Sequence, residues 1–177
     1  METMLLRLFQ RQVADQCRGV LVATPPINAA VASGDQDTLW VSIQNLVTGS
    51  ANISKALWGQ GHRYAKARER LRASLDVQDD SPLSDVSMRN HFEHYDERLD
   101  HWWATSANRN HLDRLIGPPS AVAGFTDEEM FRVFDPTTSD LVFWGQRFNV
   151  QAVVTEVERI HPLALQQAAL PHWDEPK

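Results

Sequence analysis

Apolar side chains recur every three or four residues along most of this chain, which is the spacing of amphipathic helices. The first stripe predicts a helix over residues 3–18. Thr24-Pro25-Pro26 is expected to break regular structure after it, because proline lacks the amide hydrogen that a helix needs. The stripe consists of Leu5, Leu8, Phe9, Val13, Cys17 and Val20.

Two further helices are predicted before residue 80. Asp35 or Asp37 is a suitable N-cap for the second helix, and Gly59 and Gly61 are expected to end it in a tight turn. Its apolar stripe consists of Leu39, Ile43, Leu46, Val47, Ile53 and Leu57. The third helix is expected to bury Tyr64, Ala67, Leu71 and Leu75 and to expose a basic set: Arg63, Lys66, Arg68, Arg70 and Arg72.

Ser81 followed by Pro82 is a strong helix-start signal, and it predicts a long helix over about residues 82–105. The apolar stripe of this helix consists of Met88, Phe92, Tyr95, Leu99 and Trp102. A second row beside that stripe consists of His91, His94, Arg98 and His101.

The last third of the chain changes character. Two aromatic and β-branched runs flank the turn-rich segment 135–140, which predicts a β-hairpin at about residues 131–144. A final helix with buried valines follows Gly145, and Pro162 is expected to kink or stop it. The sequence therefore predicts a single, mainly α domain over residues 1–177: a four- to five-helix up-and-down bundle with a C-terminal β-hairpin.

Composition fits a globular protein, with 42% hydrophobic and 23% charged residues. No apolar run is long enough to span a membrane, and Glu2 and Arg7 argue against a signal peptide. The lone Cys17, expected to be buried, allows no internal disulfide and favours a cytoplasmic location. A net charge of −6 disfavours broad binding to nucleic acid, but it is compatible with a local positive pocket for one phosphate.

The string Arg89-Asn90-His91-Phe92-Glu93-His94 carries the most informative chemistry. Arginine is always charged and binds phosphate with a planar fork of donors. Histidine exchanges its proton near neutral pH. Because both would be held on a rigid helix, the string predicts a phosphodiester site formed by Arg89, Asn90 and His94.

Helix geometry indicates how these side chains would meet. Asn90 and His94 are four residues apart, so Asn90 is positioned to hold a ring nitrogen of His94. Arg89 lies about 140° away from His94 around the helix, at ~100° per residue. A symmetric pair of helices would bring two such sets into one cleft. We therefore expect a homodimer with the site at its interface.

Arg89-Asn90-x-x-x-His94 resembles the arginine, polar residue and histidine motif of the HEPN superfamily (higher eukaryotes and prokaryotes nucleotide-binding domains). The resemblance covers one six-residue string and the fold class. It implies an α-helical bundle that acts as a dimer and cleaves RNA without a metal or cofactor. It also implies that Arg89 and His94 are the catalytic pair and that Asn90 supports them.

In such a site a histidine would take the proton of the RNA 2′-hydroxyl, and arginine would stabilise the charge on the phosphorane-like transition state. A second histidine, from the partner subunit, would protonate the leaving 5′-oxygen. The expected products are a 2′,3′-cyclic phosphate and a 5′-hydroxyl, and DNA should remain uncut.

Other interpretations remain open from the sequence. Arg89 and His94 are also placed to form salt bridges with neighbouring acids such as Glu93 and Glu97. His91, His94 and His101 are candidates for a metal site, although no zinc-binding motif is present. The basic set of the third helix is either an RNA-guiding surface or a solvated face. The alternative function is a non-catalytic, dimeric helical interaction or scaffold protein.

Overall fold

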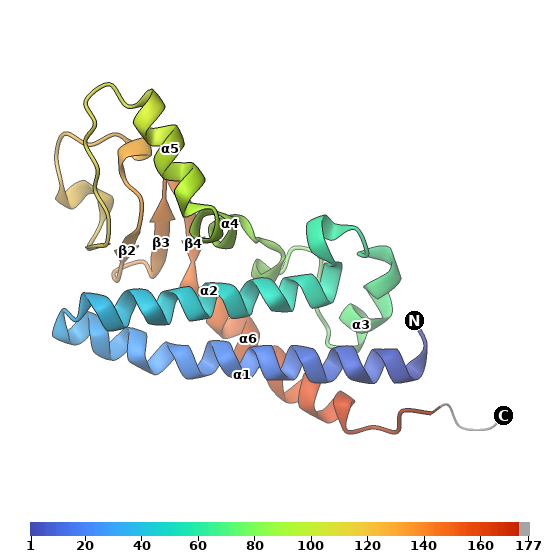
Figure 1. Ribbon diagram of the computed structural model, residues 1–177. Coiled ribbons are helices and arrows are strands. Elements are labelled where there is room, and N and C mark those ends of the chain that lie inside the picture. Colours follow the sequence, from blue (N-terminus) through green and yellow to red (C-terminus); the bar gives the residue numbers. More distant parts are fainter. Residues whose placement is uncertain (174–177) are drawn as a thin grey trace.

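The computed structural model describes residues 1–173, which form a mainly helical protein with a small mixed sheet near the C-terminus (Figure 1). The α-helices of this part are α1 (Thr3–Ser33), α2 (Gln36–Trp58), α3 (Glu69–Ser74), α4 (Ser87–Glu93), α5 (Tyr95–Thr105) and α6 (Val150–Ala168). The strands are β1 (Leu115–Ile116), β2 (Val133–Asp135), β3 (Asp140–Phe143) and β4 (Gln146–Asn149). Short 3-10 turns lie at Gln60–His62, Lys66–Arg68, Pro82–Ser84, Pro119–Ala121 and Asp127–Glu129.

Three long helices, α1, α2 and α6, form the main body, and α1 packs against both of the others. The sheet and α5 rise from one end of this body, while α3 lies at the other end (Figure 1). The core is continuous from the helices into the sheet, because Phe131 and Phe143 belong to the same buried cluster as Ile43 and Val157. Cys17 is fully buried in this core, as expected.

The expected break at Pro25 and Pro26 is wrong, since α1 continues through both prolines to Ser33. Proline removes a backbone donor, but the surrounding turn holds the helix in place. Ala23 and Ile27, on either side of the prolines, are buried in the core. The Thr24 hydroxyl also donates to the Val20 carbonyl at 3.2 Å. Burial of one helix face thus outweighs the local preference of the prolines.

The limits predicted for α2 are confirmed. The Asp35 side chain caps its start by accepting a hydrogen bond from the Thr38 amide at 3.1 Å. Gly59 ends it with φ +82, and a Cβ atom at this position would lie only 2.7 Å from the Tyr64 ring. Only glycine therefore fits the turn that follows α2.

The third predicted helix is much shorter than expected. Only Glu69–Ser74 is α-helical, because Gly61 and His62 adopt positive φ values and a 3-10 turn follows them. Leu71 is buried as predicted, whereas Tyr64 is 55% exposed.

The helix expected over residues 82–105 is divided into a 3-10 turn and the two helices α4 and α5. The division falls at His94, whose backbone (φ −106, ψ 35) leaves the helical region. The chain changes direction there, so the motif ends at a helix junction instead of lying within one straight rod.

The predicted hairpin is present as β2 and β3, within a larger sheet of order β1-β2-β3-β4. β1 pairs with β2 in parallel, and the other neighbours are antiparallel. Asn149 then caps α6 by accepting a hydrogen bond from the Ala152 amide at 2.7 Å. Pro162 lies inside α6 and does not stop it. No helix in the described part of the chain is long and apolar enough to cross a membrane.

Candidate active site

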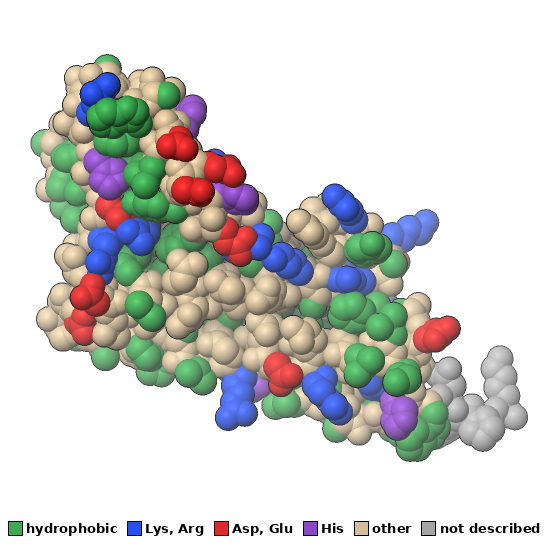
Figure 2. Space-filling model, in the orientation of Figure 1, with side chains coloured by type: hydrophobic (Ala, Val, Ile, Leu, Met, Phe, Trp, Pro, Cys, Tyr) green, Lys and Arg blue, Asp and Glu red, His purple; other side chains and the backbone are tan. Residues whose placement is uncertain are grey.

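Two of the three predicted site residues, Arg89 and Asn90, line a pocket of about 240 Å³. The pocket lies between α4 and the turn that follows α2. Its polar lining consists of Ser54, Lys55, Gln60, His62, Arg89 and Asn90. We call this cavity the α2–α4 pocket. Basic side chains gather over the corner between α4 and the α3 segment in Figure 2.

The charge of the α2–α4 pocket favours an anion. Lys55, His62 and Arg89 line it, whereas no acidic side chain within residues 1–173 does so. This local balance contrasts with the net charge of −6 of the whole chain. Its volume is below the ~300–1,000 Å³ of typical small-molecule sites, which suits a phosphate group better than a whole nucleotide.

The pocket borders the C-terminus of α2, where the partial negative charge of a helix end would repel an anion. Two arginines offset most of this repulsion, because they donate to the last carbonyls of α2. Arg68 donates to the carbonyls of Lys55 and Ala56, and Arg72 donates to the Leu57 carbonyl at 3.0 Å. The Tyr64 amide binds the last carbonyl, that of Trp58, at 3.0 Å. The final carbonyls of α2 are therefore all paired.

These contacts also change the interpretation of the basic set predicted on the third helix. Arg68 and Arg72 bind the end of α2, and Arg70 donates to the Met1 carbonyl at 2.8 Å. Arg72 is only 7% exposed. These three residues thus bind the protein's own backbone. Arg63, Lys66 and Arg70 are the exposed cations of the set.

Arg89 reaches the pocket while also forming an ion pair. Its guanidinium contacts the Glu93 carboxylate one turn along α4, and it donates to the Asn90 side-chain oxygen at 3.4 Å. Glu93 is 37% exposed and is paired with Nη2, one of the three nitrogens of the five-donor guanidinium. Arg89 therefore retains donors for a further ligand.

His94 does not line the α2–α4 pocket. Its ring is half-exposed, and Nδ1 lies 3.1 Å from the Glu97 carboxylate. The expected Asn90–His94 side-chain contact is thus replaced by one to Glu97, because the chain leaves the helix at His94. Both predicted catalytic residues have an acidic neighbour as partner, as the salt-bridge interpretation allowed.

His91, in contrast, is a structural residue. Arg98 donates to its Nδ1 at 3.2 Å, so Nε2 carries the hydrogen and donates to Gln146 at 2.8 Å. The ring stacks on Phe143, with centroids 4.6 Å apart. Burial lowers the pKa of His91 and keeps the ring neutral. Within the described residues, no group of three or more His, Cys, Asp or Glu side chains is placed to hold a metal ion.

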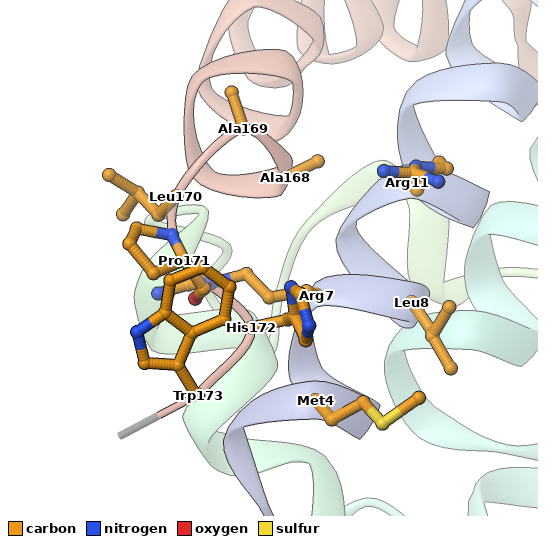
Figure 3. A pocket seen from close by; sticks show the side chains of 10 residues that line it. All are labelled: Met4, Arg7, Leu8, Arg11, Ala168, Ala169, Leu170, Pro171, His172 and Trp173. Carbon is orange, nitrogen blue, oxygen red and sulfur yellow. Dashed lines mark hydrogen bonds between the residues drawn. The ribbon is translucent and has the colours of Figure 1, made fainter. Parts of the chain in front are cut away.

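A larger hollow, of about 650 Å³, lies elsewhere, between the start of α1 and the segment after α6 (Figure 3). Met4, Leu8 and Trp173 line it and are 52–60% exposed. Arg7 also lines it and donates to the Pro171 carbonyl at 3.1 Å. We call this the terminal groove. The groove is open, and most of its lining side chains are apolar, although Arg7, Arg11 and His172 also line it.

Sequence reasoning found Arg89 and Asn90 but missed Lys55 and His62. Both lie on segments remote from the motif, so no local spacing could connect them with it. The adjacent Gly59 and Gly61 mark a tight turn, which is the only sequence signal at this position. Comparison of the chain with protein-family models, curated proteins and solved structures gave no match.

Proposed function

We propose that this protein is a metal-independent endoribonuclease of the HEPN type, built on a helical bundle. The observation that supports the proposal is the α2–α4 pocket, whose lining combines Arg89 and Asn90 of the motif with Lys55 and, among residues 1–173, includes no acidic side chain. A positive pocket on an acidic protein is the expected arrangement for an enzyme that binds one phosphodiester.

Each residue has a defined role in this proposal. Arg89 and Lys55 bind the scissile phosphate and stabilise the extra negative charge of the transition state. Asn90 orients the Arg89 guanidinium. His94 takes the proton of the 2′-hydroxyl, and the resulting alkoxide attacks phosphorus. The products carry a 2′,3′-cyclic phosphate and a 5′-hydroxyl, and DNA is not cut.

The two ion pairs set a condition on this chemistry. An incoming phosphate must compete with Glu93 for Arg89, and the RNA must draw His94 away from Glu97. Both acids are substantially exposed, and exposed pairs contribute only ~0–1 kcal/mol. The pairs are therefore weak enough for a substrate to exchange. The proposed homodimer would place two such sets in one cleft.

Cleavage of labelled RNA with and without EDTA tests the proposal. Wild type should cut RNA equally well in both conditions and leave the matching DNA intact. Arg89→Ala and His94→Ala should lose activity while keeping the thermal stability of wild type. Arg18→Ala and His172→Ala, which alter exposed side chains outside the pocket, are the matched controls. Equal cleavage by wild type and both site variants would exclude these residues from catalysis.

A second candidate function is a non-catalytic, dimeric interaction protein. Two observations favour it: Arg89 and His94 are both paired with acids, and the terminal groove exposes apolar side chains. A second copy of the chain would cover that groove. Light scattering should then show a dimer that Leu8→Lys converts to a monomer, with no RNA cleavage by wild type.

A further inference from the structure

His62 lines the α2–α4 pocket together with Arg89, although no motif marks it. Its ring is held in place on two sides. It stacks on Trp58, with centroids 5.8 Å apart and planes 19° apart. Its Nε2 lies 3.3 Å from the Ser84 carbonyl oxygen. A carbonyl oxygen only accepts, so Nε2 carries a hydrogen. Nδ1 has no hydrogen-bond partner among residues 1–173.

The backbone at His62 also has an uncommon conformation. Its φ is +57, in the left-handed region that glycine and asparagine adopt more easily. The neighbouring Gly61 has φ +58. A residue that keeps a strained conformation beside a polar pocket often has a functional role there. This conformation agrees with the place of His62 in the pocket lining and with its unpartnered ring nitrogen.

We propose that His62 is the general acid of the ribonuclease reaction and protonates the leaving 5′-oxygen; this rests on the function proposed above. In the cleavage step the 2′-oxygen bonds to phosphorus and its proton passes to His94. The bond between phosphorus and the 5′-oxygen breaks. The His62 ring, protonated on both nitrogens before this step, passes its Nδ1 proton to that oxygen and becomes neutral, while Nε2 keeps its hydrogen. Each chain then supplies its own acid, and no histidine of a partner copy is needed for the second proton transfer.

An RNA with sulfur in place of the bridging 5′-oxygen tests this role. A thiolate is a good leaving group and departs without a proton, so a missing general acid no longer slows the reaction. His62→Asn is the suitable variant, because asparagine accepts the left-handed backbone but donates no proton as an acid. His172→Asn is the matched control. Cleavage of both substrates and thermal unfolding are measured for each protein.

The expected result is a loss of about 10²-fold or more for His62→Asn on ordinary RNA and a rate close to wild type on the sulfur-containing RNA. Wild-type rates of His62→Asn on ordinary RNA would overturn the role. Equal losses on both substrates would also overturn it and would assign His62 to binding or structure. Both outcomes leave the Arg89-dependent ribonuclease intact. A wild-type protein that cleaves neither substrate overturns the proposed function itself, and this role with it.

Discussion

Arg132 and Arg89 show two ways in which this chain places a guanidinium beside a carboxylate. Arg132 donates to both oxygens of Asp113, with Nε at 2.7 Å, and lies over the Tyr95 ring at 4.8 Å. Arg89 contacts Glu93 through one nitrogen at the edge of the α2–α4 pocket. The Arg132–Asp113 pair is bidentate, whereas the Arg89–Glu93 pair leaves guanidinium donors without a partner.

The chemistry of the Asp113–Arg132 pair supports a structural role. Burial opposes ionisation of Asp113, but hydrogen bonds from Arg132 outweigh it and lower the carboxyl pKa. The bond to Asp113 raises the Arg132 pKa, and burial raises the pKa of Tyr95 to about 12. Asp113 and Arg132 therefore both stay charged throughout the physiological pH range. An arginine is therefore a candidate for binding an anionic ligand only where its carboxylate partner leaves some guanidinium donors available.

The largest effect is expected from Arg89→Ala. Loss of one charge-stabilising donor in an enzyme site typically lowers the rate by ~10²–10³-fold, or about 2.7–4 kcal/mol of barrier. Turnover of labelled RNA gives the rate, and thermal unfolding shows whether the fold is retained. Arg89→Lys should recover only part of the activity, because lysine lacks the planar fork. Full activity of Arg89→Ala would mean that Arg89, like Arg132, has a structural role and does not bind substrate.

Arg132→Ala should act on stability instead. It leaves the Asp113 carboxylate, which is 17% exposed, without its main partner. Because both side chains of the pair keep some contact with solvent, we expect the free energy of unfolding to fall by about 2 kcal/mol, less than for a fully buried pair. Urea unfolding measures this change. Arg147→Ala, in the more exposed pair with Asp140, is the control and should cost at most about 1 kcal/mol.

A third test uses His91, whose two ring nitrogens are both hydrogen-bonded, to Arg98 and Gln146. Its pKa is lowered on folding, so the unfolded chain binds the proton more tightly. The stability that the neutral ring contributes is present above an unfolded pKa of about 6.5 and is lost as the pH falls towards the lower folded value. The melting temperature should therefore drop between about pH 7.5 and pH 5. His91→Gln should flatten this dependence, because glutamine has no group that titrates in this range.

The smallest effect is expected from Glu93→Gln. Removing the negative partner of Arg89 should strengthen binding of inorganic phosphate to the α2–α4 pocket by a few-fold, since an exposed pair is worth ~0–1 kcal/mol. Isothermal titration calorimetry measures the affinity. Glu128→Gln, at an exposed position remote from the pocket lining, is the control. Weaker phosphate binding by Glu93→Gln would mean that Glu93 organises Arg89 instead of competing for it.

Much of the fold could be predicted from local signals. Asp35 and Gly59 marked the ends of α2 correctly, and the aromatic runs marked β2 and β3. The failures have one cause, which is that tertiary packing overrides local preference. Pro25 and Pro26 stay helical because the neighbouring turns are buried, and β1 joins the sheet although only two residues pair.

The candidate site was predictable only in part. Arg89 and Asn90 share a helix, so their proximity follows from sequence spacing. Lys55 and His62 reach the same pocket because α2 ends beside α4, and that contact depends on the whole fold. His94 fell outside the pocket because α4 ends at Glu93, a boundary that the continuous apolar stripe concealed.

The two arginines at the end of α2 have a practical consequence for genetics. Arg72 holds Leu57 and Ala65 by their carbonyls, and so fixes both ends of the loop that carries His62. A random screen for inactive mutants would recover changes at Arg72 and Gly59 as readily as changes at Arg89. Such variants would look like changes in the α2–α4 pocket itself, although Arg72 acts by holding the loop through the Leu57 and Ala65 carbonyls.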